Sequence, residues 1–496
     1  MRHFFHLLTI LLFATPLAAQ AGADLHLEAA VYTTTDGTEI KAKTGYLTVK
    51  ENRDDPASAD IKLPFVRLKS TAAQAAAPLV YLEGGPGSSC TWMAGDPRAL
   101  DRWAPLLALN DVILVDQRGT GGAGRRLTYI NFAGPPADAF VTREAAKTYL
   151  TGMTTMARAA WAEAGVDHRG YTTLASAADL DDLRLAMGLD QISLLGFSYG
   201  TQLGQAYMKY YGDHVSKAIL VGVEGLDETF KLPGRMDAQL RKLSALVAAD
   251  PELSGEIPDL VALYLRVSQK LAAEPVEVEV SDPLSGQPLK LLIGKYGLDH
   301  ILMLDMGDAT DLPVIPRLLY EIDRGEYGAL AWFAGKRVGG LYGIHAMAAT
   351  MDVASGLSPA RRALIAEKAE TSLFGDLLCG HLLWMGDGLD APDLGPEYRA
   401  AFTSTIPTLL LSGSLDMNTP PEQAERLRWN LTNARHLVVR NAGHEQILTN
   451  KDAQRAIGLF LAGQPLDGIT PEEPALTFIP LTGQGKAVWH PAVSAR

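Results

Sequence analysis

The sequence lacks the features that define several common classes of protein. It has 496 residues but only two cysteines, so no framework of disulfides holds it together. No His-Glu-x-x-His spacing or similar cluster of metal ligands occurs, and we expect neither a metal nor another cofactor. Basic residues are outnumbered by acidic ones, and a formal net charge of −13 argues against nucleic acid and anionic lipid as partners.

Long apolar runs are also missing, except at the N-terminus. There one arginine precedes an apolar stretch from Phe4 to Leu17, and small residues follow, which is typical of a secretory signal peptide over residues 1–21. An uncleaved anchor is the alternative, although a membrane span needs about 20 residues and this stretch is shorter. We expect an exported protein, periplasmic or secreted, without stable membrane insertion after cleavage. In that compartment Cys90 and Cys379 form either one disulfide or two buried thiols.

The rest of the composition is that of an ordinary globular protein, 47% hydrophobic and 20% charged. The length suits one large core with an insertion, or two to three domains. Alternating residues between Leu25 and about Ser70, with turn signals between them, predict antiparallel hairpins at the start of the core.

Short apolar runs without alternation then recur, and such runs are typical of parallel strands buried on both faces. They are Pro78–Leu82, Asp111–Val115, Ile192–Leu195, Ala218–Gly222, Pro407–Leu411 and His436–Arg440. Helical spacing follows or precedes several of them, for example at Ala175–Met187 and from Gly200 to about Tyr211. This rhythm predicts an α/β fold with a mostly parallel central sheet.

Residues 226–400 lack this alternation of strands and helices, which indicates a mainly helical cap inserted into the core. The core would then comprise residues 22–225 and 401–496. Helical patterns cover Arg235–Ala249, Pro258–Leu271, Leu312–Ile322 and Pro359–Glu370, and a hairpin joins Val276–Val280 to Leu289–Ile293. We expect this cap to cover the strand ends and to select what reaches them.

A candidate catalytic triad follows from three strand ends. Ser198, in Gly-Phe-Ser-Tyr-Gly, lies between a predicted strand and a predicted helix, as in a nucleophile elbow. A serine hydroxyl needs a base and a group that orients the base. Asp416 and His444 each follow a later strand, and the chain order Ser, Asp, His is that of α/β-hydrolases. We therefore predict Ser198 as nucleophile, His444 as base and Asp416 as its orienting group.

An acyl-transfer site also needs N–H donors for the oxyanion. The amide of Tyr199, at the N-terminus of the predicted helix, is one candidate. Gly85, in the Glu83–Gly87 loop after an earlier strand, is the other, with Gly84 next to it; an ordinary Gly-Pro turn is the competing interpretation.

Several segments resemble one branch of a known family. EGGPG, VDQRGTGGAG, GFSYG, LSGSLDMNTPPEQAERL and NAGHEQ are similar to motifs of the prolyl-aminopeptidase and tripeptidyl-aminopeptidase branch of the α/β-hydrolases. The likeness covers roughly residues 78–225 and 400–450. It implies an α/β-hydrolase fold and a serine peptidase that removes residues or short peptides from free peptide N-termini through an acyl-enzyme. It also implies that Asp116 and Arg118 brace the loop beside the site.

The sequence departs from that pattern at two places. Glu83 stands where many members have histidine, and Gly-Ala-Gly follows DQRGTG in place of the commoner ending with serine. An aminopeptidase also binds a protonated amine, and Glu224, Asp227 and Glu228 follow the strand after the elbow. Solvated acids at a domain junction are the competing interpretation, and none of the three is assigned.

Two other functions fit the same motifs. The same triad would hydrolyse an ester or another acyl bond, so a periplasmic esterase is the alternative enzyme. A non-catalytic binding protein on a hydrolase scaffold is the alternative from another class, although the intact set of Ser198, Asp416 and His444 speaks against it.

Overall fold

A nine-stranded sheet organises the protein in the computed structural model, which describes residues 24–121 and 127–481. The strand order is β1-β2-β3-β5-β4-β7-β8-β12-β13. Strands β1 (Leu25–Thr33), β2 (Glu39–Lys50) and β3 (Asp60–Leu68) pair antiparallel, and β3 joins β5 (Asn110–Val115) antiparallel. These are the hairpins predicted at the start of the core.

The other strands run parallel to β5. They are β4 (Ala76–Leu82), β7 (Ile192–Phe197), β8 (Val215–Val221), β12 (Thr408–Gly413) and β13 (Ala434–Val439). Every residue of β5, β7 and β12 is buried, which explains why their sequences do not alternate. The mostly parallel sheet with helices on both faces confirms the predicted α/β-hydrolase fold.

Two sets of helices cover the two faces of the sheet. The helices α3 (Thr173–Ala186), α4 (Tyr199–Tyr210) and α14 (Pro421–Arg428) pack into one hydrophobic cluster, with Leu82 and Leu194 of the sheet. The helices α1 (Pro97–Trp103) and α16 (Lys451–Leu461) pack into the other, with Tyr81 and Leu195. Successive residues of a strand therefore pack against helices on opposite faces of the sheet. The ends of the strands are not covered by these helices and can form the site.

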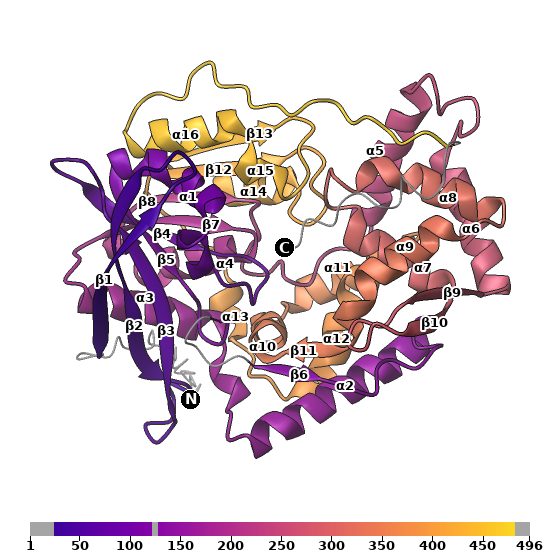
Figure 1. The fold of residues 1–496 in the computed structure, drawn as a ribbon, viewed down its shortest axis with the longest axis horizontal. Coiled ribbons are helices and arrows are strands. Elements are labelled where there is room, and N and C mark those ends of the chain that lie inside the picture. Colours follow the sequence, from indigo (N-terminus) through magenta and orange to yellow (C-terminus); the bar gives the residue numbers. More distant parts are fainter. Residues whose placement is uncertain (1–23, 122–126, 482–496) are drawn as a thin grey trace, which may run out of the picture.

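The insertion lies beside the sheet, at the right of the view in Figure 1. Its helices are α5 (Arg235–Ala249), α6 (Leu260–Ala273), α7 (Lys295–Asp305), α8 (Ile315–Asp323), α9 (Gly328–Val338), α10 (Ala346–Ser355), α11 (Pro359–Ala369), α12 (Leu377–Leu389) and α13 (Gly395–Arg399). The predicted hairpin is present as β9 (Val276–Ser281) and β10 (Pro288–Ile293). Much of the insertion buries its apolar residues in a further hydrophobic cluster, which also includes Leu415 and Met417 on either side of Asp416.

A segment assigned to the core from the sequence packs both on the core, through Met153, Ala157 and Trp161, and against the insertion. The strand β6 (Thr128–Ile130) pairs with β11 (Gly343–His345), and α2 (Arg143–Glu163) runs along the lower edge of the insertion in Figure 1. A side-chain carbon at Gly388 would lie 2.1 Å from Thr154 Oγ1, so only glycine lets α12 approach α2 this closely. The insertion therefore packs against residues that precede Ser198 in the chain, those of β6 and α2.

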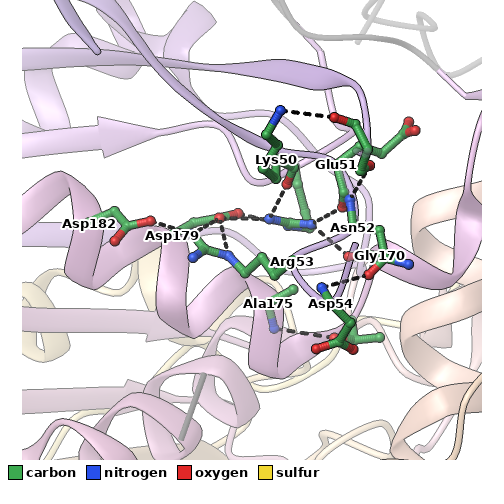
Figure 2. A network of polar contacts seen from close by, with 12 residues as sticks. Lys50, Glu51, Asn52, Arg53, Asp54, Gly170, Ala175, Asp179 and Asp182 are labelled. Atoms are coloured by element: carbon green, nitrogen blue, oxygen red, sulfur yellow. Dashed lines mark hydrogen bonds and ion pairs between the residues drawn. The ribbon is translucent and has the colours of Figure 1, made fainter. Parts of the chain in front are cut away.

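Buried ion pairs tie the N-terminal hairpins, through Arg53, to Asp179 and Asp182 of α3 (Figure 2), and Arg118 in the loop after β5 joins them. Arg118 donates from Nε and NH2 to Asp179, at 2.8 and 2.7 Å, and from NH1 to the Glu51 carbonyl at 2.6 Å. Arg53 donates to the same Asp179 and to Asp182 at 2.6 Å. Burial opposes ionisation of Asp179, but the guanidinium groups of Arg118 and Arg53 outweigh it and keep its pKa below the ordinary value. Arg118 thus has the bracing role that the family resemblance implies.

The two cysteines form no disulfide. Cys90 and Cys379 are both free and buried, in separate hydrophobic clusters, so two buried thiols is the correct alternative.

The C-terminal part of the described chain, residues 464–481, joins the two parts of the molecule. The Arg440 N–H donates to the Pro471 carbonyl at 3.0 Å, beside the end of β13. Farther along, Phe478 packs in the cluster of the insertion, and the Ile479 N–H donates to the Pro313 carbonyl at 3.2 Å. Figure 1 shows this segment in yellow along the top of the molecule.

The predicted signal peptide lies outside the described residues. Within the part of the chain that the structure describes, no helix combines the length and the apolar character that crossing a membrane requires.

Candidate active site

Ser198 occupies a sharp turn between β7 and α4. Its backbone has φ 53° and ψ −122°, a conformation that non-glycine residues rarely adopt outside strained functional turns. The turn fits only because small residues flank it: a side-chain carbon at Gly200 would lie 1.9 Å from the Leu82 carbonyl oxygen. At Gly196 it would lie 2.4 Å from the carbonyl oxygen of Gly200. This geometry is that of a nucleophile elbow.

Asp416 and His444 are joined at the ends of β12 and β13. His444 Nδ1 lies 2.8 Å from Asp416 Oδ2, and Asp416 is fully buried. Thr419 fixes the carboxylate from the other side, since its N–H donates to Oδ1 at 2.9 Å and its hydroxyl donates to Oδ2 at 2.6 Å. Because Asp416 accepts the Nδ1 proton, Nε2 is left as the nitrogen that can take up a proton.

The electrostatics of the pair suit a base. Burial alone would lower the pKa of His444, but the charge of Asp416 and the hydrogen bond to it outweigh burial and raise this pKa above its ordinary value. Burial would raise the pKa of Asp416, but His444 and Thr419 outweigh it and lower that pKa, so the carboxylate stays ionised. A buried imidazole held by an ionised carboxylate is the arrangement that general-base catalysis by histidine requires.

Ser198 and His444 line one cleft of about 1130 Å³. The rings of Phe197 and His444 have centroids 5.0 Å apart, so the base lies beside the residue that precedes the serine. Within the described residues no hydrogen bond joins Ser198 to His444; catalytic hydrogen bonds are often loose before substrate binds. The structure therefore brings together all three residues that the sequence singles out.

The loop after β4 reaches the serine. A side-chain carbon at Gly84 would lie 3.0 Å from Ser198 Cβ, and both Gly84 and Gly85 line the cleft. The Gly84 N–H already donates to Glu83 Oε1 at 2.8 Å, whereas the Gly85 N–H makes no hydrogen bond among the described residues. Tyr199 is the first residue of α4, so its N–H has no partner within the helix. The Gly85 and Tyr199 N–H groups are thus better placed than that of Gly84 to serve as the donors predicted from the sequence.

Glu83 holds that loop from inside. Besides the Gly84 N–H, its carboxylate accepts the Tyr81 hydroxyl at 3.2 Å, and its backbone carbonyl accepts Gln117 Nε2 at 2.8 Å. Burial raises the pKa of the Glu83 carboxyl above its ordinary value. The departure from histidine at this position therefore places an acceptor under the oxyanion loop.

Asp116 braces the same region, as the family resemblance implies. Fully buried at the end of β5, it accepts the N–H groups of Cys90 and Thr91 at 2.7 and 3.0 Å and the Thr91 hydroxyl at 2.9 Å. These bonds fix the short 3₁₀ helix Thr91–Ala94, which continues the wall of the cleft beyond the oxyanion loop.

The three acids after β8 differ in their surroundings. Asp227 accepts the N–H and hydroxyl of Ser358, at 2.8 and 2.6 Å, and Glu228 pairs with Arg426. Glu224 is 6% exposed, and among the described residues no group donates to its carboxylate. Two of the three acids are therefore engaged by neighbouring residues, and Glu224 is the buried one without such a donor in the described chain.

The insertion also holds the loops of the site, which the sequence did not reveal. The His444 N–H donates to the Gly307 carbonyl at 3.0 Å. Gln239 Nε2, on α5, donates to the carbonyls of Leu415 and Met306 at 2.8 and 2.9 Å. Such long-range contacts leave no local pattern, whereas Thr419, three residues after Asp416, is an Asx-type partner that its spacing could have indicated.

Fold and site together define an α/β hydrolase. Residues 77–262 match the family model for the alpha/beta hydrolase fold, and residues 388–471 match the model described as TAP-like protein. Within residues 24–121 and 127–481 no group of three His, Cys, Asp or Glu side chains is placed to hold a metal ion.

More particularly, the chain is similar to peptidases. It is 29% identical over 194 residues to the tripeptidyl aminopeptidases of Streptomyces lividans and Streptomyces coelicolor, which is 36% of this chain and 35% and 34% of theirs. It is 44% identical over 50 residues to the serine protease Hip1 of Mycobacterium tuberculosis, 10% of either chain. The chain thus spans only about a third of the length of the Streptomyces relatives.

The solved structures that are similar to this chain include a proline iminopeptidase-related protein from Thermus thermophilus. It is 16% identical, with a TM-score of 0.36 over 88% of this chain and 98% of that chain. A thermophilic esterase from Thermogutta terrifontis is 14% identical, with a TM-score of 0.36 over 88% and 98%.

Proposed function

We propose that the protein is an exported serine aminopeptidase that releases residues or short peptides from free peptide N-termini. The observation that carries the proposal is one cleft lined by the strained Ser198, by His444, which Asp416 holds from behind the surface, and by Gly84 and Gly85. The similarity to proteins named tripeptidyl aminopeptidase and serine protease supports the same reaction class.

In the proposed reaction the Ser198 hydroxyl attacks the scissile carbonyl carbon while His444 Nε2 takes its proton. The amides of Gly85 and Tyr199 donate to the oxyanion. The imidazolium then protonates the leaving amine, the C–N bond breaks, and the acyl group stays on Ser198. Water, deprotonated by His444, attacks that ester, and its cleavage returns the serine hydroxyl and frees the acyl product as a carboxylic acid.

Glu224 is the residue we propose to bind the protonated N-terminal amine. Its N–H donates to Thr201 Oγ1 at 2.8 Å, and that hydroxyl donates to the Ser198 carbonyl at 2.7 Å, so Glu224 is anchored next to the elbow. Asp352 follows Met351, whose sulfur lies 2.8 Å from the Tyr199 hydroxyl. Burial, and then the charge of Glu224, raise the pKa of Asp352 well above its ordinary value. A bound ammonium group would relieve the repulsion between these two acids.

A panel of aminoacyl and tripeptidyl arylamides, assayed beside simple aryl esters and N-acetylated arylamides, tests the proposal. We expect cleavage of the free arylamides and labelling of Ser198 by a fluorophosphonate, both lost in Ser198→Ala. Activity on esters alone, or equal activity on N-blocked substrates, would favour the esterase. A wild-type protein that the fluorophosphonate does not label would favour the binding protein.

Glu224→Gln separates recognition of the amine from chemistry. We expect KM for free arylamides to rise about 10–100-fold, since a charge-assisted hydrogen bond is lost, while turnover of an aryl ester without an amine stays the same. The ester serves as the internal control. An equal loss on both substrates would assign Glu224 to the structure of the elbow.

A further inference from the structure

The cleft is larger than the reacting groups need. Its volume of about 1130 Å³ exceeds the roughly 300–1,000 Å³ of a typical small-molecule site. Beyond Ser198 it continues between two walls, one made of Thr91–Ala94 and α1, the other of α15 (Gln446–Thr449). The extension is therefore a place for a part of the substrate that does not react.

The position of His444 decides which part of the substrate this is. Nδ1 is bonded to Asp416, so Nε2 must hand its proton to the leaving amine. The residues that directly follow His444 in the chain line the same cleft, among them Gln446 and Leu448. The chain that leaves with the amine would thus lie along α15, opposite Thr91–Ala94 and α1.

The wall opposite α15 offers an apolar surface. Trp92 lines the cleft with 55% of its side chain exposed, an unusual exposure for tryptophan inside a site. Its indole N–H donates to the Ser89 carbonyl at 3.0 Å, and the preceding Thr91 is held by Asp116. The ring is therefore fixed in place with an apolar face open to the cleft, beside Met93.

The same wall offers a cation. Arg102 lines the cleft from α1, and it makes no hydrogen bond or ion pair with any residue that the structure describes. Asp96, at the start of the helix, is already engaged, because it accepts the N–H groups of Arg98 and Ala99 at 2.8 and 3.1 Å. This half-buried guanidinium is close enough to Glu83 to oppose the rise in the pKa of that carboxyl, but it makes no hydrogen bond to it. Inside a substrate cleft, such a guanidinium is suited to bind a further carboxylate.

We infer that this extension binds the leaving segment of a short peptide, with an apolar side chain on Trp92 and the C-terminal carboxylate on Arg102. The inference rests on the proposed function and narrows its substrates to short oligopeptides with a free C-terminus. Longer chains would have to carry their carboxylate past Arg102 and would lose that ion pair.

The test uses peptides that share the acyl part of the best arylamide substrate, followed by Phe or Phe-Ala, each as the free acid and as the C-terminal amide. We expect the wild type to have an about tenfold lower KM for the acid than for the amide. Arg102→Met should raise the KM of the acid to that of the amide, with kcat and arylamide turnover changed less than about twofold. Arg102→Lys should restore part of the preference.

Arg98→Met is the matched control, because Arg98 lies exposed on the same helix and does not line the cleft. It should leave the preference for the acid unchanged. Trp92→Ala should reduce the preference for Phe over Ala as the first leaving residue by about fivefold.

Equal KM values for acid and amide in the wild type would overturn the inference, and so would an equal loss of arylamide and peptide turnover in Arg102→Met. A preference for amidated peptides with Glu in the leaving segment would show that Arg102 binds a side-chain carboxylate and not the C-terminal one, which would also overturn the inference. If the wild type hydrolyses esters but no peptide, the proposed function and this inference both fail. If it cleaves peptides without preference for the acid, this inference alone fails.

Discussion

The sheet and the insertion contribute to the site in different ways. The sheet supplies the groups proposed to react, because β7, β12 and β13 are each followed by one member of the Ser198, Asp416 and His444 set. The insertion supplies contacts that hold their loops, such as the Gly307 carbonyl on the His444 N–H and Gln239 on the Leu415 carbonyl. The comparison indicates that the reacting groups and the contacts that position them come from separate parts of the chain. Substitutions in the sheet and in the insertion test this division.

The largest effect is expected at the sheet side, in Asp416→Asn. The amide cannot stabilise the imidazolium and favours the wrong tautomer of His444, so kcat should fall about 10⁴-fold. Circular dichroism should show an unchanged fold, since the shape of the side chain is kept. A loss of less than tenfold in steady-state arylamide assays would show that another group orients His444.

A core residue remote from the chemistry should affect stability instead. Arg118→Met leaves the buried carboxylate of Asp179 with one of its two guanidinium partners, and we expect about 3–5 kcal/mol less stability in urea unfolding. Arg169→Met is the control, because the exposed Arg169–Asp167 pair should contribute about 1 kcal/mol or less. Equal effects of the two substitutions would contradict a structural role for the Arg118 network.

On the insertion side, Gln239→Leu removes the hydrogen bonds that this side chain of α5 gives to the Leu415 carbonyl, beside Asp416, and to the Met306 carbonyl, beside Gly307. The buried carbonyls of Leu415 and Met306 lose a donor, at a cost of about 1–3 kcal/mol, and we expect kcat to fall about tenfold while KM changes little. Arg241→Met, exposed on the same helix and without a hydrogen bond to the site loops among the described residues, is the control. Wild-type kcat in a destabilised Gln239→Leu protein would show that the insertion holds the fold and not the site.

The smallest effect is a shift in the pH profile. His444 must be neutral to accept the serine proton, so kcat/KM should fall as pH drops through its pKa, which Asp416 raises above 6.5. The acid limb of the wild-type profile should therefore have its midpoint above pH 6.5. In Asp416→Asn the raising charge is gone while burial remains, and the midpoint should move to lower pH. A midpoint that does not move would mean that Asp416 is not the charge that His444 senses.

The same two regions differ in how much the sequence reveals. The core strands could be predicted because a strand that is buried on both faces consists of a few adjacent apolar residues, as at Ile192–Leu195. The helix α5 was predicted with its observed bounds, Arg235–Ala249, because one of its faces is buried and the other is exposed. Ser198, Asp416 and His444 could be found because each follows such a strand.

Elements stabilised by one another were missed. The middle of α2 contains Gly152 and several threonines, which disfavour an isolated helix, and α12 is apolar on all sides with three glycines. Each is stable because it packs on the other, with Thr154 against Gly388. Trp92 and Arg102 were missed for the same reason. They line the cleft only because their segment lies near α15, which is about 350 residues away in the chain.

Residues 464–481 impose an order of assembly on the molecule. They are synthesised after the last helix of the sheet and long after the insertion, yet they make contacts with both, at Arg440 and at Pro313. A nascent chain therefore has a complete sheet and a complete insertion before it has the segment that links them. Until then, only direct contacts between the sheet and the insertion can hold these two parts together. Their final arrangement is secured once residues 464–481 have been synthesised.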